Sequence, residues 1–289
     1  MYAITGITGK VGGELARQLL ADGAAVRAIV RDAAKAQKWA SLGCEVAVAE
    51  MEDAAALQEA FTGASSVFIL PPSVFDPEPG YPEAKAVIHS VVTALAATTP
   101  QRVLCLSTIG ADAEQDNLLS QRTLMEAALR ALAIPLTILR PAWFIDNAAW
   151  DVASARDDGI IRSFLLPGDK AFPMVAAKDV GRVAAKLIQE RWTGVRVFEL
   201  EGPRRETPNG LADAFARALG KPVRAVPVPR ESWAALFRSQ GMKHPEPRIR
   251  MLDGFNEGWI DFQNGGSQAI KGPTSAEVVI AGLLAVANA

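Results

Sequence analysis

Three glycines near the amino terminus, Gly6, Gly9 and Gly12, are spaced three residues apart and could bind phosphate. They follow a short apolar run and open an amphipathic pattern, so we expect a strand, a turn and a helix. The first glycine would allow a tight turn, the second a close approach to pyrophosphate, and the third close helix packing. The helix amino terminus would face the phosphates with free N–H groups. The expected dinucleotide contacts in this segment are Gly6, Thr8, Gly9, Lys10, Val11 and Gly12.

A second candidate lies at the end of the next expected strand, where Arg31 precedes Asp32. Here a carboxylate would hold the ribose hydroxyls of NAD, whereas an arginine would accommodate the 2′-phosphate of NADP. Arg31 carries a guanidinium suited to phosphate, and Asp32 is suited to cap the following helix. The sequence therefore favours NADP(H) over NAD(H), with a plain surface charge as the alternative for Arg31. Glu50 and Met51, after the third strand, are expected beside the adenine.

The elements that must position these residues alternate short β-branched runs with longer helical patterns. This alternation predicts an α/β protein with a doubly wound parallel sheet of the Rossmann type. The expected strands are residues 2–5, 25–30, 45–49, 66–70, 102–107 and 136–139, and the expected helices are residues 11–21, 33–42, 54–61, 81–97 and 118–133. We predict an NAD(P)-binding domain at 1–145 and a smaller, interleaved α+β substrate lobe at 146–289. Within the lobe we expect a long loop at 254–272 and a terminal helix at 278–287.

Composition narrows the class of protein. The 289 residues carry 30 basic and 32 acidic side chains, a net charge of −2 that suggests neither a nucleic-acid groove nor binding to an anionic membrane. No apolar stretch is long enough to span a bilayer and no signal-peptide pattern opens the chain, so we predict a cytoplasmic protein. Cys44 and Cys105 are expected to be buried thiols, and no metal site is expected because neither His89 nor His244 has ligands at metal spacing.

The glycine turn, Arg31 and the later segment 138–147 (ILRPAWFIDN) resemble the NmrA-like group of atypical short-chain dehydrogenases. The resemblance extends nearly over the whole chain through segments 178–181 (KDVG), 201–203 (EGP), 219–223 (LGKPV) and 271–274 (KGPT). That group includes NADP-sensing regulators and NAD(P)H-dependent reductases of quinones and triphenylmethane dyes. The resemblance implies that the nicotinamide is lined by Leu70, Pro71, Pro72, Ser107, Thr108, Pro141, Trp143 and Phe144. Each also has a structural explanation, as rigid loop, strand cap or core.

The tyrosine and lysine pair that ordinary short-chain dehydrogenases use for proton transfer is absent. When Glu126 is aligned with the glutamate that follows this pair, Leu118 takes the tyrosine position and Arg122 the lysine position. Arg122 could anchor a ribose or a phosphate, but a guanidinium stays protonated at neutral pH and so cannot donate a proton there. Reduction of a conjugated acceptor does not need a strong proton donor in the protein, because hydride addition gives a stabilised anion that water or the Ser107 hydroxyl could protonate. Ser107 and Arg122 are therefore the candidate catalytic residues.

Three functions remain open at this point. The leading hypothesis is a reductase, monomeric or homodimeric, that transfers hydride from NADPH to a small apolar quinone-, dye- or carbonyl-type acceptor. The second is a non-catalytic NADP(H) sensor that acts through a protein partner, which the missing tyrosine motivates. The third is a sugar or isoflavone-type reductase or epimerase. The aromatic and apolar residues that would suit a flat substrate, or else form plain core, are Phe75, Trp143, Phe144, Trp150, Phe172 and Met174.

Overall fold

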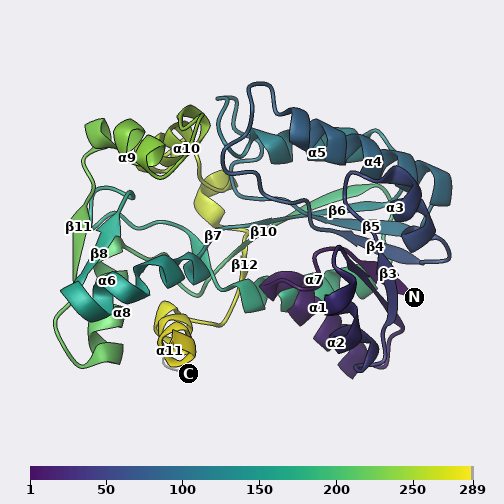
Figure 1. Cartoon of the computed structure of the whole chain (residues 1–289), viewed down its shortest axis with the longest axis horizontal. Coiled ribbons are helices and arrows are strands. Elements are labelled where there is room, and N and C mark those ends of the chain that lie inside the picture. Colours follow the sequence, from purple (N-terminus) through teal and green to yellow (C-terminus); the bar gives the residue numbers. More distant parts are fainter. Residues whose placement is uncertain (288–289) are drawn as a thin grey trace.

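The computed structural model describes residues 1–287, and an eight-stranded sheet lies at its centre (Figure 1). Its strands are β1 Tyr2–Ile4, β2 Val26–Val30, β3 Glu45–Val48, β4 Ser66–Ile69, β5 Arg102–Leu106, β6 Leu136–Pro141, β10 Val195–Glu201 and β12 Ile270–Lys271. They are all parallel, in the order β12-β10-β6-β5-β4-β1-β2-β3. The predicted Rossmann-type sheet is confirmed, and all six predicted strands are present with small shifts at their ends.

Helices cover both faces of this sheet, which explains why its inner strands are nearly continuous apolar runs. On one face lie α1 Lys10–Ala21, α2 Ala36–Ala40 and α7 Ala177–Gln189, and on the other lie α3 Ala54–Phe61, α4 Pro82–Thr98 and α5 Ser120–Arg130 (Figure 1). The predicted helix at 33–42 divides into a 3₁₀ turn, η1 Ala33–Lys35, followed by α2. Asp32 begins that turn as predicted, since its carboxylate accepts a hydrogen bond from the Ala34 N–H at 2.9 Å.

The strand order reverses at β1, which lies between β2 and β4. In an open parallel sheet the connecting segments diverge to opposite faces at such a point, leaving a crevice at the carboxyl ends of the strands. The Thr5 hydroxyl fixes this edge: it donates to the Phe68 carbonyl at 3.1 Å and accepts from the Leu70 N–H at 2.8 Å. The fold therefore predicts a ligand site beside the glycine turn.

The second half of the chain contributes β10 and β12 to the main sheet and builds a further group of elements beside it (Figure 1). In that group α6 Val152–Asp158, α8 Pro208–Leu219 and α11 Ala276–Ala287 pack around the parallel strands β8 Ile160–Ser163 and β11 Arg224–Pro227. The remaining elements are β7 Trp143–Phe144, η2 Ile145–Asp151, β9 Met174–Val175, η3 Arg230–Ser232, α9 Trp233–Ser239, α10 Glu246–Glu257 and η4 Gln263–Gly266. The predicted terminal helix is present as α11, whereas the division of the chain at residue 145 stays a prediction.

The predicted loop at 254–272 is wrong at both of its ends. α10 continues to Glu257, and residues 270–271 form strand β12. Gly254 lies inside the helix and not in a loop, and only glycine fits there because the chain turns back closely over it. A Cβ at this position would lie 2.6 Å from atoms of Trp259 and Ile260.

The sequence also makes predictions about the cysteines and about the possibility of a membrane-spanning helix. Cys44 and Cys105 are buried, unpaired thiols, as expected. Across residues 1–287 we find no helix with both the length and the apolar character that a bilayer crossing requires.

Candidate functional site

The glycine turn joins β1 to α1 in a conformation that depends on its glycines. Gly6 has a φ of +63°, in the left-handed region, and its carbonyl accepts from the Gly9 N–H at 3.0 Å. A Cβ on Gly12 would lie 2.5 Å from the Gly6 carbonyl oxygen, so the helix starts where only glycine fits. No side chain caps α1 and no acidic residue stands in its first turn. The N–H groups that open α1 are therefore available to an anion.

The residues predicted to meet the adenosine end lie at the ends of β2 and β3. Arg31 is exposed and forms no ion pair with any of residues 1–287, so its guanidinium can take a phosphate. Met51 is buried and lines the same cavity as Arg31, whereas Glu50 is exposed and lies outside it. Glu52, two residues further on, is the acidic side chain that reaches the cavity wall here.

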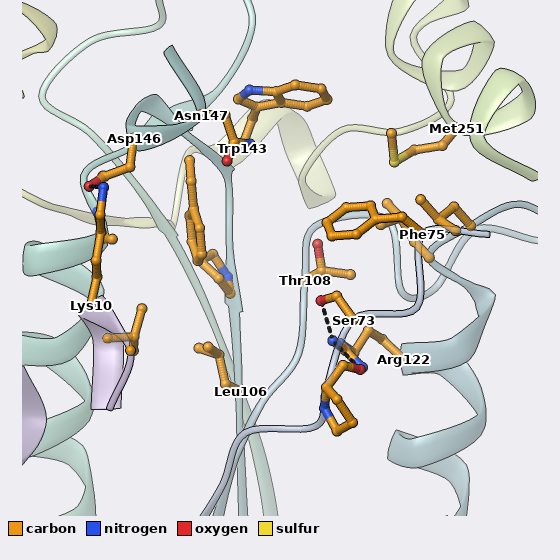
Figure 2. Close-up of a pocket in the computed structure, with 18 of the residues that line it drawn as sticks. Lys10, Ser73, Phe75, Leu106, Thr108, Arg122, Trp143, Asp146, Asn147 and Met251 are labelled. Atoms are coloured by element: carbon orange, nitrogen blue, oxygen red, sulfur yellow. Dashed lines mark hydrogen bonds and ion pairs between the residues drawn. The ribbon is translucent and has the colours of Figure 1, made fainter. Parts of the chain in front are cut away.

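A single cavity of about 1380 Å³ runs from this turn along the carboxyl ends of the strands. Of the residues predicted to bind cofactor or catalyse, only Gly12 and Glu50 lie outside its wall. Of the predicted aromatic and apolar set, Phe172 does not line the cavity and belongs to the buried core. Figure 2 shows Lys10 on one side of the cavity and Phe75, Arg122 and Met251 on the other, with Trp143 and Asn147 between them. The cavity exceeds the roughly 300–1,000 Å³ of common ligand pockets, so it has room for two ligands.

Arg122 is engaged by the loop that follows β4. Its guanidinium donates to the carbonyls of Pro71 at 3.0 Å and Pro72 at 3.2 Å and to the Ser73 hydroxyl at 3.0 Å (Figure 2). No carboxylate within residues 1–287 balances its charge, and burial lowers its pKa. Arg122 therefore holds the loop that carries Phe75 into the cavity, and Leu118, at the aligned tyrosine position, is an apolar part of the same wall.

Ser107 belongs to a buried ionic network at the end of β5. Its hydroxyl donates to Glu126 at 2.5 Å, and Glu126 accepts from two guanidinium nitrogens of Arg140 at 2.9 and 2.7 Å. A third nitrogen of Arg140 donates to Asp112 at 2.7 Å. Burial disfavours the charged form of Arg140, but Glu126 and Asp112 outweigh this and raise its pKa. Because the Ser107 proton is directed at Glu126, the hydroxyl presents a lone pair to the cavity.

Sequence reasoning missed the link between the glycine turn and the second half of the chain. Lys10 forms an ion pair with Asp146 at 2.8 Å, and Asp146 also accepts from the Ala177 N–H at the start of α7 (Figure 2). Both charged residues and the neighbouring Asn147 line the cavity. Nothing in the spacing of Lys10 and Asp146 along the chain indicates this contact, because 136 residues separate them.

Tyr81, one of two tyrosines in the chain, is not placed for proton transfer. It is buried outside the cavity wall, and its hydroxyl donates to Asp116 at 2.8 Å and approaches the Asn117 carbonyl at 2.9 Å. Burial and the Asp116 carboxylate raise its pKa well above the ordinary value. Tyr81 therefore fixes the segment ahead of α5.

Asp151 is a cavity carboxylate that the sequence did not single out. Burial raises its pKa from 3.8 to about 6, although a backbone hydrogen bond from Arg162 opposes the shift. The ionised form of the carboxylate is therefore less stable, relative to the protonated form, in the folded protein than in the unfolded chain. The resulting cost to stability is absent below pH about 4, where both states are protonated, and complete above pH about 6.

Replacing Asp151 by asparagine should remove this cost while keeping a hydrogen-bond acceptor. We expect Asp151→Asn to exceed the wild type in free energy of unfolding by about 1–2 kcal/mol at pH 8, after allowance for partial solvent exposure. Near pH 3.5 the two proteins should be equally stable. Urea titrations at both pH values would measure the difference, and an asparagine variant that is less stable at pH 8 would contradict the assignment.

The family model described as NAD(P)H-binding matches residues 6–191, so the chain belongs to this NAD(P)H-binding family. The matched region contains the glycine turn, Arg31, Ser107 and Arg122. The predicted relation is thereby confirmed, and the fold is that of the atypical short-chain dehydrogenases which the sequence resembles.

Individual relatives extend over most of the chain. Quinone oxidoreductase 2 of Escherichia coli is 29% identical over 245 residues, covering 84% of this chain and 82% of that protein. NAD(P)H azoreductase of Xenophilus azovorans is 25% identical over 260 residues, which cover 89% of this chain and 85% of that protein. The crystal structure of the NADPH-dependent quinone oxidoreductase of Escherichia coli superposes with a TM-score of 0.77 at 26% identity, over 98% of this chain and 99% of that one. Triphenylmethane reductase of Citrobacter sp., complexed with NADP(H), shares the fold with a TM-score of 0.81 at 23% identity, covering 98% and 99%.

Proposed function

We propose that this protein is an NADPH-dependent reductase that transfers hydride to a flat, conjugated acceptor of the quinone or azo-dye kind. The observation that carries the proposal is the continuity of this cavity, which begins at the glycine turn and continues into space walled by Trp143, Phe144 and Met174. One continuous cavity lets a cofactor and an acceptor lie in contact. The named activities of the quinone oxidoreductase and the azoreductase support the same acceptor class.

The residues present fit a phosphorylated dinucleotide. The uncapped start of α1 can receive the pyrophosphate, and the missing Cβ at Gly12 lets α1 begin directly against the Gly6 carbonyl, which keeps the turn closed. Arg31, which has no carboxylate partner within residues 1–287, is placed to hold the 2′-phosphate. NADPH, when bound, supplies the hydride, and the protein supplies position and the exclusion of water.

Arg31→Ala should weaken NADPH binding by about 1–3 kcal/mol and leave NADH binding nearly unchanged, because only NADPH offers a phosphate to this guanidinium. Calorimetric titration with both cofactors would measure the two affinities. Lys38→Ala is a matched control, since it removes a nearby exposed charge on α2 outside the cavity. Equal losses for NADPH and NADH in the Arg31 variant would contradict the assignment.

In this proposal no side chain has to act as a strong acid. The Ser107 hydroxyl, held by Glu126, would accept a hydrogen bond from the cofactor ribose or amide and so help to hold the nicotinamide. Arg122 holds the loop from Pro71 to Ser73 in the cavity wall, where this loop would contact the same ring. The anion formed on a quinone or azo acceptor is stabilised by conjugation, so water can protonate it after the hydride step.

The test is NADPH oxidation with a panel of quinones, azo dyes, triphenylmethane dyes and simple aldehydes. We expect turnover with the conjugated acceptors and little with aldehydes, which need a proton donor at the carbonyl oxygen. Rates at the buffer level across the whole panel would overturn the proposal. They would favour the sensor hypothesis, which requires a protein partner whose affinity changes with cofactor.

A further inference from the structure

We propose, building on the proposed reductase function, that the acceptor carries an anionic group and that Arg248 binds it. Arg248 lies on α10, is half-buried and lines the cavity. It is not part of the glycine turn, of the adenosine end or of the nicotinamide contacts described above. The cavity residues that share its wall, Leu236, Gln240, Met251 and Leu252, include no carboxylate.

The charge of Arg248 is uncompensated within residues 1–287. Two nearby arginines are paired with one carboxylate, since Arg230 contacts Asp253 at 2.6 Å and Arg250 contacts it at 3.9 Å. Within residues 1–287 Arg248, in contrast, donates only to the Met242 sulfur at 3.7 Å and stacks over the Phe237 ring at 4.3 Å. Burial lowers its pKa, and no hydrogen-bonded anion opposes the shift. A half-buried cation that gains so little from the protein is suited to gain from a ligand.

The position of Arg248 separates this contact from the cofactor phosphates. Met251 lies three residues further along α10 and therefore on the same side of the helix. Figure 2 shows Met251 on the same side of the cavity as Phe75, across from Lys10. Arg248 thus faces the acceptor end, where Phe75 and Trp143 also line the cavity.

The shape of the site indicates the chemistry of the ligand. A planar guanidinium binds carboxylate, sulfonate or phosphate oxygens through two parallel N–H groups, and the Gln240 amide adds a donor in the same wall. Apolar groups from Leu236, Met251 and Leu252 surround this polar pair. The site therefore fits an aromatic acceptor whose acidic substituent points towards α10.

The activity test compares each acidic acceptor with a neutral partner: naphthoquinone-2-sulfonate with naphthoquinone, and a carboxylated azobenzene with its methyl ester. Arg248→Gln should lower kcat/KM by about 10- to 100-fold for the acidic members, the value of one charge-assisted contact, and by less than about 2-fold for the neutral ones. Arg248→Lys should recover part of the loss. Arg250→Gln, on the same helix but outside the cavity, is the matched control and should leave both members unchanged. Equal losses for acidic and neutral acceptors, or none, would overturn the inference.

A binding measurement decides the question without turnover, so its failure is distinct from a failure of the reductase proposal. In the presence of NADP⁺, 2-naphthoate, naphthalene-2-sulfonate and 2-naphthyl phosphate are titrated against 2-naphthamide by calorimetry. At least one anion should bind the wild type about 10-fold more tightly than Arg248→Gln, and the tightest identifies the acid class. The amide and NADP⁺ should bind both proteins alike. Equal anion affinities, or a parallel loss of NADP⁺ affinity, would overturn the inference.

Discussion

Arg140→Met is expected to lower the free energy of unfolding by about 3–5 kcal/mol, the largest effect of any single change considered for this protein. The substitution removes both short contacts to Glu126 and leaves that buried carboxylate with the Ser107 hydroxyl and a more distant Arg130, at 3.6 Å. Methionine nearly fills the space of the arginine stem, so most of the loss reflects an unpaired buried charge. Urea denaturation followed by circular dichroism would measure it.

Two companion variants separate charge from packing. Adding Glu126→Gln to Arg140→Met removes the stranded charge, so the double variant should recover a good part of the lost stability. Arg238→Met, which breaks an exposed pair with Glu246, should change stability by no more than about 0.5 kcal/mol. A loss below about 1 kcal/mol for Arg140→Met, or a double variant no better than the single one, would contradict the account of this network.

Gly12→Ala should weaken NADPH binding by at least about 100-fold, or about 2.7 kcal/mol. Its Cβ would lie 2.5 Å from the Gly6 carbonyl oxygen and 2.8 Å from the Gly6 carbonyl carbon, so the turn that receives the pyrophosphate must shift. Because both contacts are to backbone, no side-chain rotation can relieve them. Fluorescence titration with NADPH would give the affinity, and the melting temperature would report whether the fold survives.

Two other glycines give a graded series for this prediction. A Cβ on Gly9 would lie 3.3 Å from the same carbonyl oxygen, so Gly9→Ala should weaken binding less than Gly12→Ala. Gly282, in α11, has open space around it, and Gly282→Ala should leave NADPH binding unchanged and add about 0.5–1 kcal/mol of stability. If alanine at positions 9 and 12 binds NADPH as tightly as the wild type, the glycine turn is not the phosphate site.

The sequence predicted well those parts of the fold that depend on local chemistry. Strands β1 to β6, the glycine turn and the cap at Asp32 are each specified by residues close together in the chain. Strand β12 has only two residues and exists because β10 offers it a free edge, so no local pattern could reveal it. Gly254 likewise does not mark a loop, because its small size allows a tertiary contact with Trp259 and Ile260 that the local sequence does not reveal.

The residues of the candidate site also fall into those that the sequence could predict and those that it could not. Residues that follow strand ends, such as Leu70, Thr108 and Trp143, were predictable from the family resemblance, and they line the cavity because parallel strands bring their carboxyl ends to one edge. Contacts between distant segments could not be placed. The Lys10–Asp146 pair and the approach of α10 with Arg248 depend on how the second half of the chain folds over the first. The half-buried position of Asp151 likewise has no sequence pattern.

In the proposed reaction NADPH and a conjugated acceptor meet in one cavity, where NADPH transfers a hydride to the acceptor. A single-turnover experiment with NADPH deuterated at one or the other face of C4 tests it most directly, because product release does not mask the transfer step. We predict that one deuterated form oxidises several-fold more slowly with naphthoquinone than unlabelled NADPH, while the other does not. Rapid NADPH oxidation at equal rates for both labelled forms, or no oxidation above the buffer rate, would contradict the claim.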